Sequence, residues 1–195
     1  MAHELFVAQG YEHTTVDQIT EAVDVSQRTF FRYFSSKEDV AFALQDETES
    51  AFYDAVCARP AGESPMRALR NALDTTWESL GESIQEVVPI SVHMRMWHVI
   101  ETTPALVAVH LRRSTDMEDR LAAVFARREG LPTDDPRPRV LTAAFSGVMR
   151  AAGRQWGEGQ DVTVDAARRW METYLDLMGP VLSDDWSRST SHPGG

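Results

Sequence analysis

Apolar residues recur at helical spacing along nearly the whole chain, and alternating runs typical of strands are almost absent. Residues 4–9 are typical of the end of a helix, which Gly10 can stop in the left-handed backbone region. Thr15 and Gln18 form a capping box that predicts a short helix through Val23. The chain therefore begins with short helices separated by clear stop and start signals.

Two more helices follow directly in this pattern. Ser26 is a favoured cap and predicts a second short helix to about Phe34. Ser35 and Glu38 form another capping box, which predicts a long helix to about Ala58. The rest of the chain has further caps, first-turn prolines and glycine stops. These signals predict helices at about 65–80, 82–102 with a bend at Pro89, 104–130, 139–157 and 163–180.

Together the pattern predicts an all-α fold of about nine helices, with a three-helix module in front of a larger helical bundle. The segment 131–138 is rich in proline and aspartate and is predicted to be a loop. Residues 183–195 are rich in serine, glycine and proline and are predicted to form a disordered tail.

Composition narrows the class of protein. No apolar run approaches the ~18 residues of a membrane span, and the start of the chain lacks a basic stretch followed by an apolar core. The one cysteine, Cys57, excludes an internal disulfide, so we expect a cytoplasmic protein with no membrane partner. The net charge of −11 argues against nucleic-acid binding unless the basic residues cluster on one small face.

Residues 14–40, TTVDQITEAVDVSQRTFFRYFSSKEDV, have the spacing of a helix-turn-helix. Asp24 stands in the turn and is among the few residues other than glycine that tolerate the left-handed backbone region. A miniature core is predicted from apolar residues of both helices: Val16, Ile19, Val23, Val25, Phe30 and Phe34. No acidic residue lies between Val25 and Lys37, so the basic residues are concentrated on the second helix.

The side chains left outside this core suit DNA contacts. Gln27 can pair with adenine and Arg28 with guanine in the major groove. Lys37 lies on the first turn of the next helix, where phosphate is attracted. The full set of predicted DNA-binding residues is Thr15, Gln27, Arg28, Thr29, Phe31, Arg32, Tyr33 and Lys37.

Residues 10–40 resemble the DNA-binding domain of the TetR (tetracycline repressor) family. The resemblance implies a helix-turn-helix in helices two and three, a ligand pocket in helices four to seven, and dimerisation by helices eight and nine. The chain departs from the family at Asp24, where glycine is usual, and in a truncated first helix. We therefore predict a DNA-binding domain at 1–43 and a ligand-binding and dimerisation domain at 44–182.

A short window around Trp97 is rich in methionine, histidine and tryptophan. It is either a buried core helix with two polar tips or one wall of a mostly apolar ligand pocket. The second reading predicts the ligand-binding residues Trp77, His93, Met94, Trp97, His98 and Glu101. His93 and His98 do not project together, so we expect no metal site.

The last two helices carry more apolar surface than one core-facing stripe needs, which predicts a homodimer. The residues predicted at this interface are Ala143, Gly147, Ala151, Trp170 and Tyr174. The segment around Glu101-Thr102-x-Pro104-Ala105-Leu106 also resembles an actinobacterial branch of the TetR family. That branch is associated with acyl-CoA-like or other lipophilic effectors.

No phosphate-binding loop, nucleophile elbow or zincin motif is present, so neither an enzyme nor a cofactor is expected. The resemblance implies a repressor that binds double-stranded operator DNA as a homodimer. Two-fold symmetry implies a palindromic operator, and the family default is release by a small, here lipophilic, effector. The alternative is a helical regulator that does not bind DNA and acts through protein contacts, which the short first helix and the acidic balance favour.

Overall fold

A computed structural model describes residues 1–87, 90–159, 161 and 163–181. Within these residues the chain forms nine α-helices and no strand, as predicted. In chain order they are α1 (Ala2–Gln9), α2 (Val16–Ala22), α3 (Gln27–Tyr33), α4 (Lys37–Ala58), α5 (Pro65–Val87), α6 (Ile90–Thr102), α7 (Pro104–Arg128), α8 (Pro136–Gly157) and α9 (Val164–Val181). None of the described helices is long and apolar enough to cross a membrane. The tail predicted at 183–195 lies outside the described residues.

Several helix starts are where the caps predicted them, whereas the cap of α4 is shifted by one residue. Thr15 and Gln18 form the predicted capping box of α2, and Ser26 caps α3. The box predicted from Ser35 and Glu38 is wrong by one residue. The hydroxyl of Ser36 accepts from Asp39 N at 3.2 Å, and the Asp39 carboxylate accepts from Ser35 N at 2.9 Å.

Two other boundaries also differ from the prediction. The break expected near residue 81 is absent, because α5 continues to Val87 before α6 begins at Ile90. The bend predicted at Pro89 lies outside the described residues. α8 begins at Pro136 rather than at Arg139, because the Asp135 carboxylate caps it and a first-turn proline loses no helical hydrogen bond.

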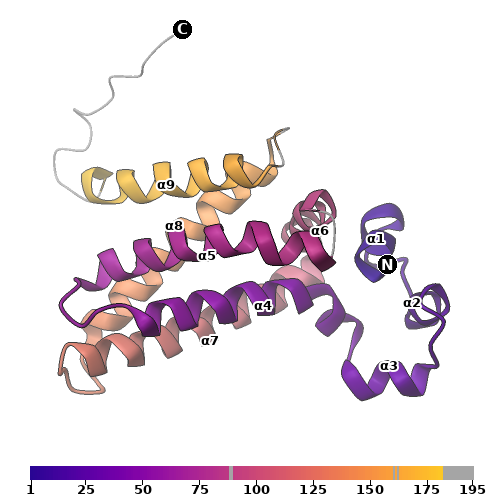
Figure 1. Ribbon diagram of the computed structural model, residues 1–195, viewed down its shortest axis with the longest axis horizontal. Helices are drawn as coiled ribbons and strands as arrows, with labels where there is room; N and C mark the ends of the chain where they lie inside the picture. The colour runs from indigo at the N-terminus through magenta and orange to yellow at the C-terminus, as the bar shows by residue number, and fades with distance from the viewer. Residues whose placement is uncertain (88–89, 160, 162, 182–195) are drawn as a thin grey trace, which may run out of the picture.

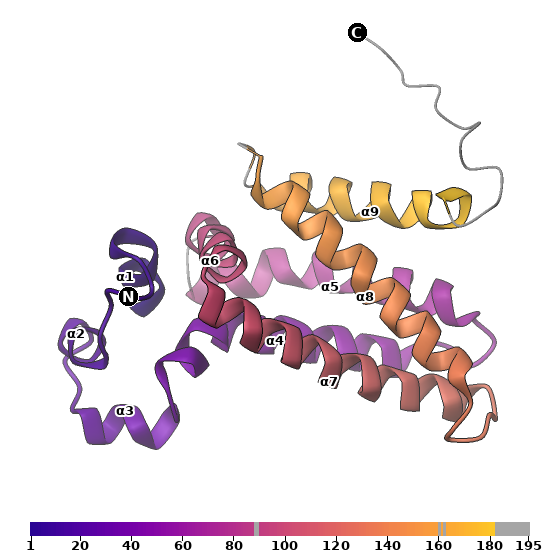
Figure 2. The same cartoon turned by 180° about the vertical axis from the view of Figure 1, so that it is seen from behind.

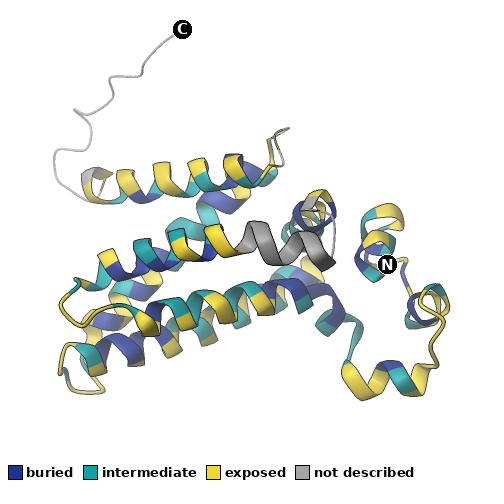
Figure 3. Ribbon diagram, viewed as in Figure 1, coloured by how far each residue is buried: buried dark blue, intermediate teal, exposed yellow. Residues whose placement is uncertain are grey.

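The three short helices form a small unit at one end of the molecule, beside the long helices of the bundle (Figure 1). Seen from behind, α8 crosses the bundle obliquely and α9 lies along its outer side (Figure 2). α8 packs against both α7 and α9, and α4 packs against α5. The burial pattern follows this layout, because α3 is mostly exposed whereas α4 and α7 turn buried faces inward (Figure 3).

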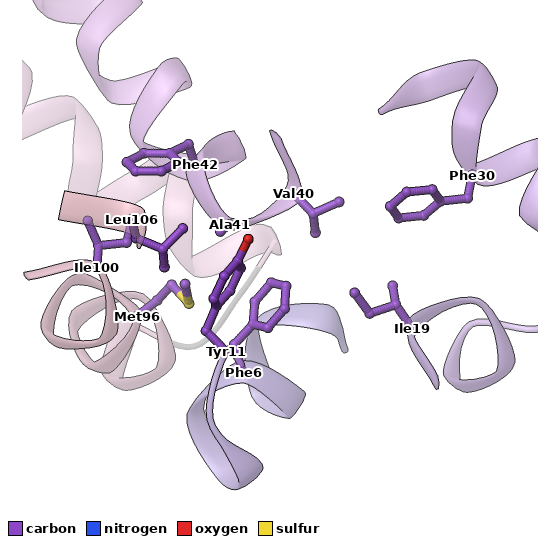
Figure 4. Close-up of a cluster of buried hydrophobic side chains, with 10 residues drawn as sticks. All are labelled: Phe6, Tyr11, Ile19, Phe30, Val40, Ala41, Phe42, Met96, Ile100 and Leu106. Carbon is purple, nitrogen blue, oxygen red and sulfur yellow. The ribbon is translucent and has the colours of Figure 1, made fainter. Parts of the chain in front are cut away.

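One apolar cluster joins the small unit to the bundle. Phe6 of α1 and Tyr11 pack with Phe42 of α4 and with Met96 and Ile100 of α6 (Figure 4). A ring nitrogen of His3, Nε2, also lies 2.8 Å from the carbonyl oxygen of Val40. Since α1 and α6 share this core, we expect a movement of α6 to shift α1 and, through it, the position of the helix-turn-helix.

Candidate DNA-binding surface and ligand cavity

The turn between α2 and α3 is held by a few specific contacts. Asp24 has a φ of 50°, the left-handed conformation predicted for it. Ile19 and Phe30 are buried between the two helices, as expected. Val23 and Val25 were also predicted in this core, but they are 43% and 39% exposed because they flank the tight turn at its outer side. Buried residues of α1 and α4 complete the small core in their place.

The outer face of α3 presents polar and aromatic side chains to solvent. Arg28 is exposed, Phe31 is 53% exposed and Tyr33 is 70% exposed. Arg32 donates to the hydroxyl of Tyr33 at 3.0 Å, and its guanidinium lies 4.7 Å from the centre of that ring. This face therefore offers positive charge beside flat apolar surface.

Gln27 and Thr29 are less free than their neighbours on α3. The Gln27 amide donates to the Asp17 carboxylate of α2. Thr29 is half-buried, and its hydroxyl lies 3.0 Å from that of Ser26. The bond to Asp17 occupies one of the two amide N–H groups of Gln27 and fixes the side chain toward α2, so the exposed Arg28 is the better placed of the two predicted base readers.

Lys37 is engaged inside the small unit. Its ammonium donates to the carbonyl oxygens of Tyr11 at 2.9 Å and Thr14 at 3.0 Å, and it lies 4.0 Å from the centre of the Tyr11 ring. Two of its three donors are therefore used to fasten the α1–α2 loop to α4. Thr15 is likewise engaged as the cap of α2. Phosphate contacts by Lys37 and Thr15 stay predictions.

The bundle contains a partly open cavity of about 210 Å³. All six helices from α4 to α9 contribute to its wall, so α8 and α9 must be added to the predicted set of helices four to seven. Its aromatic and histidine side chains are Phe52, Trp77, His93, Trp97, His110, Phe145 and Trp156. Its methionines are Met94, Met117, Met149 and Met171. Such a wall suits a largely apolar ligand.

The predicted ligand-binding residues divide into two groups. Trp77, His93, Met94 and Trp97 line the cavity. His98 does not line it: the side chain is exposed, about 100° further round α6 than Trp97. Glu101 does not line it either, but its Oε1 lies 3.6 Å from Nε2 of His110, which does.

Burial controls the charge of the groups around this cavity. It lowers the pKa of His93 to about 4, with a smaller contribution from nearby His3. Burial also lowers the pKa of His110, and the positive charges of Arg150 and Arg113 act in the same direction. It raises the pKa of the Glu101 carboxyl. Both cavity histidines are therefore neutral at pH 7.

Several cavity residues were not predicted as ligand contacts. Phe145, Met149 and Trp156 were assigned to the bulk of the dimerisation helix, yet all three line the cavity. Their spacing of i, i+4 and i+11 places them on one face of α8, which is the signal that could have identified them. His110 had no such signal, because its place beside Trp97 depends on how α6 and α7 cross.

The predicted dimerisation residues lie on the outside of α8 and α9. Ala143 is exposed, Gly147 and Ala151 are half-buried, and Trp170 is 38% exposed. A Cβ at Gly147 would meet only the end of the Arg150 side chain, at 4.0 Å. Gly147 is therefore not crowded within the chain, and the role of this surface in dimerisation stays a prediction.

Comparison with known proteins gives consistent matches over the chain. Residues 1–44 match the family of bacterial regulatory proteins called the tetR family, and residues 63–182 match the MftR C-terminal domain. The transcriptional regulator TcmR of Streptomyces glaucescens is 45% identical over 188 residues, covering 96% of this chain and 83% of TcmR. The regulator MftR of Mycobacterium tuberculosis is 29% identical over 185 residues, covering 93% of this chain and 87% of MftR.

A solved structure gives the same fold. The crystal structure of the TetR-family repressor FadR of Thermus thermophilus, in complex with lauroyl-CoA, aligns with a TM-score of 0.51 at 20% identity. The alignment covers 100% of this chain and 96% of that one. The named relatives are transcriptional regulators rather than enzymes.

Proposed function

This chain belongs to the TetR family of DNA-binding, ligand-responsive regulators, and we propose that it is a repressor. In this proposal α3 binds a palindromic operator. The observation that carries the proposal is the exposed face of α3. It places Arg28 and Arg32 beside Phe31 and Tyr33 with no acidic residue on the helix, in a chain whose net charge is −11. Arg28 is the proposed reader of a guanine edge, and Arg32 and Tyr33 are the proposed phosphate contacts.

The operator symmetry follows from a proposed homodimer. Val140 of α8 is 67% exposed, and Leu177 of α9 is 49% exposed, beside the predicted interface residues. Two α3 helices related by a two-fold axis reach successive major grooves when they stand about 34 Å apart. The operator is then two inverted half-sites with this spacing.

The proposed effector is a small lipophilic molecule in the cavity that helices α4 to α9 line. Its wall is mainly aromatic and thioether, which suits an apolar body of variable shape. The FadR neighbour was crystallised with lauroyl-CoA, which is an acyl compound. An effector can shift DNA binding only by its differential affinity for two conformations. α6 offers the route, because Trp97 lines the cavity while Met96 packs against α1.

The test is a gel shift with the DNA upstream of the protein's own coding region, beside random DNA of equal length. A repressor binds the upstream fragment preferentially and as a dimer. Equal, weak binding to both fragments would contradict the proposal and favour the alternative of a helical regulator that acts through protein contacts. Arg28→Ala is the informative variant, because it removes the proposed base contact from an exposed position.

A further inference from the structure

Three tryptophans from three different helices meet at the cavity. Trp77 comes from α5, Trp97 from α6 and Trp156 from α8, and all three line it. Each indole Nε1 is shielded from solvent and has no hydrogen-bond partner within the part of the chain that the structure describes. Buried indole N–H groups are normally paired, and leaving one unpaired costs about 1–3 kcal/mol. Three such donors around one cavity therefore need an explanation.

Several other polar groups of the same wall have partners, although Nε2 of His110 has none among the described residues. The hydroxyl of Thr48 donates to the carbonyl oxygen of Leu44 at 3.0 Å, and that of Thr76 donates to Ala72 at 2.8 Å. The guanidinium of Arg150 is held by Glu118 at 3.0 Å. The unmatched hydrogen-bonding capacity of the tryptophans is thus donor capacity, since an indole nitrogen cannot accept.

The Nε1 of Trp97 lies against Gly153 of α8. A Cβ built at Gly153 of α8 would lie 3.4 Å from Cζ2 and 3.5 Å from Nε1 of this indole. The indole edge therefore rests on a helix backbone that offers it no acceptor. This N–H would meet an acceptor oxygen in the cavity only after the ring turns away from Gly153, and the new bond would favour that turned conformation.

We infer that the effector is an aromatic lipophile bearing at least one carbonyl-type oxygen, which accepts a hydrogen bond from one or more of these three indole N–H groups. This inference rests on the proposed function of the cavity. The apolar body lies against aromatic and methionine side chains, and the oxygen supplies an acceptor for indole N–H groups that have none within the described residues. A hydrocarbon would leave the donors unpaired.

An ammonium-bearing lipophile is the main competing ligand class. Aromatic faces attract cations, and Glu49 also lines the cavity. Arg150 lines it as well, however, and the three indole N–H groups repel a second donor. The observations therefore favour a ligand with an acceptor oxygen, and the test includes an ammonium compound as the competing class.

The test uses three probes with one skeleton: 2-acetylnaphthalene, 2-ethylnaphthalene and 1-(2-naphthyl)ethylammonium. Isothermal titration of the full chain is expected to show the ketone binding about 3–10-fold more tightly than the hydrocarbon, as one hydrogen bond predicts. Trp77→Phe, Trp97→Phe and Trp156→Phe remove the donor and keep an aromatic ring. At least one should lower the ketone-to-hydrocarbon affinity ratio about 3–10-fold. Tyr53→Phe on α4, which removes a donor and keeps the ring outside the cavity wall, should leave the ratio unchanged.

The ketone-to-hydrocarbon affinity ratio distinguishes the loss of the hydrogen-bond donor from the loss of ring volume, because a smaller ring weakens the binding of both ligands. Equal affinity for ketone and hydrocarbon, or tightest binding of the ammonium compound, would overturn the inference while leaving the cavity as the effector site. An unchanged ratio in all three variants would also overturn it. Binding of none of the probes would contradict the cavity as effector site, and the inference with it. The wild-type series keeps the test decisive even if a variant fails to fold.

Discussion

The imidazole of His110 lies parallel to the ring of Phe42, with ring centroids 6.4 Å apart and planes inclined by 7°. His110 lines the ligand cavity, whereas Phe42 belongs to the apolar cluster that includes Phe6 of α1. This stacked pair therefore connects the wall of the cavity to the junction between the bundle and the helix-turn-helix.

This contact predicts that His110 transmits the effector signal. His110→Leu removes the stacked ring, so a bound ligand should lose part of its effect on operator affinity. Coupling energies of this kind are about 1–3 kcal/mol, and we expect a loss within that range. Operator affinity measured with and without 2-acetylnaphthalene tests it, with the exposed His98→Leu as control. A ligand effect of full size in His110→Leu would place the route elsewhere.

Lys37 is predicted to stabilise the small unit. Lys37→Met keeps most of the apolar stem but removes two charge-assisted hydrogen bonds to loop carbonyls. The free energy of unfolding should fall by about 1–3 kcal/mol, because such bonds to charged groups are worth that much. Urea denaturation measures it, and Arg95→Met on the surface of α6 is the matched loss of charge. If Lys37→Met were as stable as wild type and only bound DNA less well, phosphate binding would be its main role.

Gly147 tests the proposed dimer. Within one chain a side chain at this position meets only the end of Arg150, so Gly147→Glu should fold normally. In a close crossing of two α8 helices the same side chain would be buried with its charge, which disfavours the dimer. Light scattering should then give a monomer mass. Gly62→Glu, in open space on the α4–α5 loop, should remain dimeric. A monomeric wild type would contradict the dimer itself.

His93 is predicted to make the fold sensitive to acid. Its pKa falls from 6.5 to about 4 on folding, so below pH 6.5 the unfolded chain binds a proton that the folded chain does not. Stability from this group is therefore complete above pH 6.5 and is lost as the pH falls toward 4. At pH 5 the loss is on the order of 2 kcal/mol.

His93→Gln should flatten this part of the stability profile, whereas His13→Gln on the surface should not. Glu49 and Glu101 have pKa values raised by burial, so they act in the opposite sense as the pH falls through those values. Both variants keep these carboxyls, and the comparison cancels them. Identical profiles from pH 7 to 4.5 for wild type and His93→Gln would show that His93 is not the titrating group.

The helices were predictable from the sequence because their start signals are local. Thr15, Ser26 and Thr163 cap helices at the predicted positions, and Asp24 takes the predicted turn conformation. The shift at α4 has a local cause too. Ser35 and Ser36 each have an acidic residue three positions on, so the two capping boxes are equivalent in the sequence.

The cavity was only partly predictable because it depends on helix crossings. Spacing on α6 placed His93 and Trp97 on one face, which is the face that lines the cavity. Spacing could not show where that face ends, so His98 was included although it is exposed. The sequence allowed Trp156 to face either of two apolar surroundings, a partner subunit or the interior of the bundle. Only the packing of α8 across the bundle decides between them.

Fluorescence anisotropy over a range of salt concentrations tests whether α3 reads operator DNA. Arg28→Ala is compared with Arg137→Ala, which removes the same charge from the exposed start of α8. We predict that Arg28→Ala weakens operator binding by about 1–3 kcal/mol, with a smaller effect on random DNA. Arg137→Ala should match wild type on both. Equal losses on operator and random DNA, or equal effects of the two variants, would contradict sequence reading by α3.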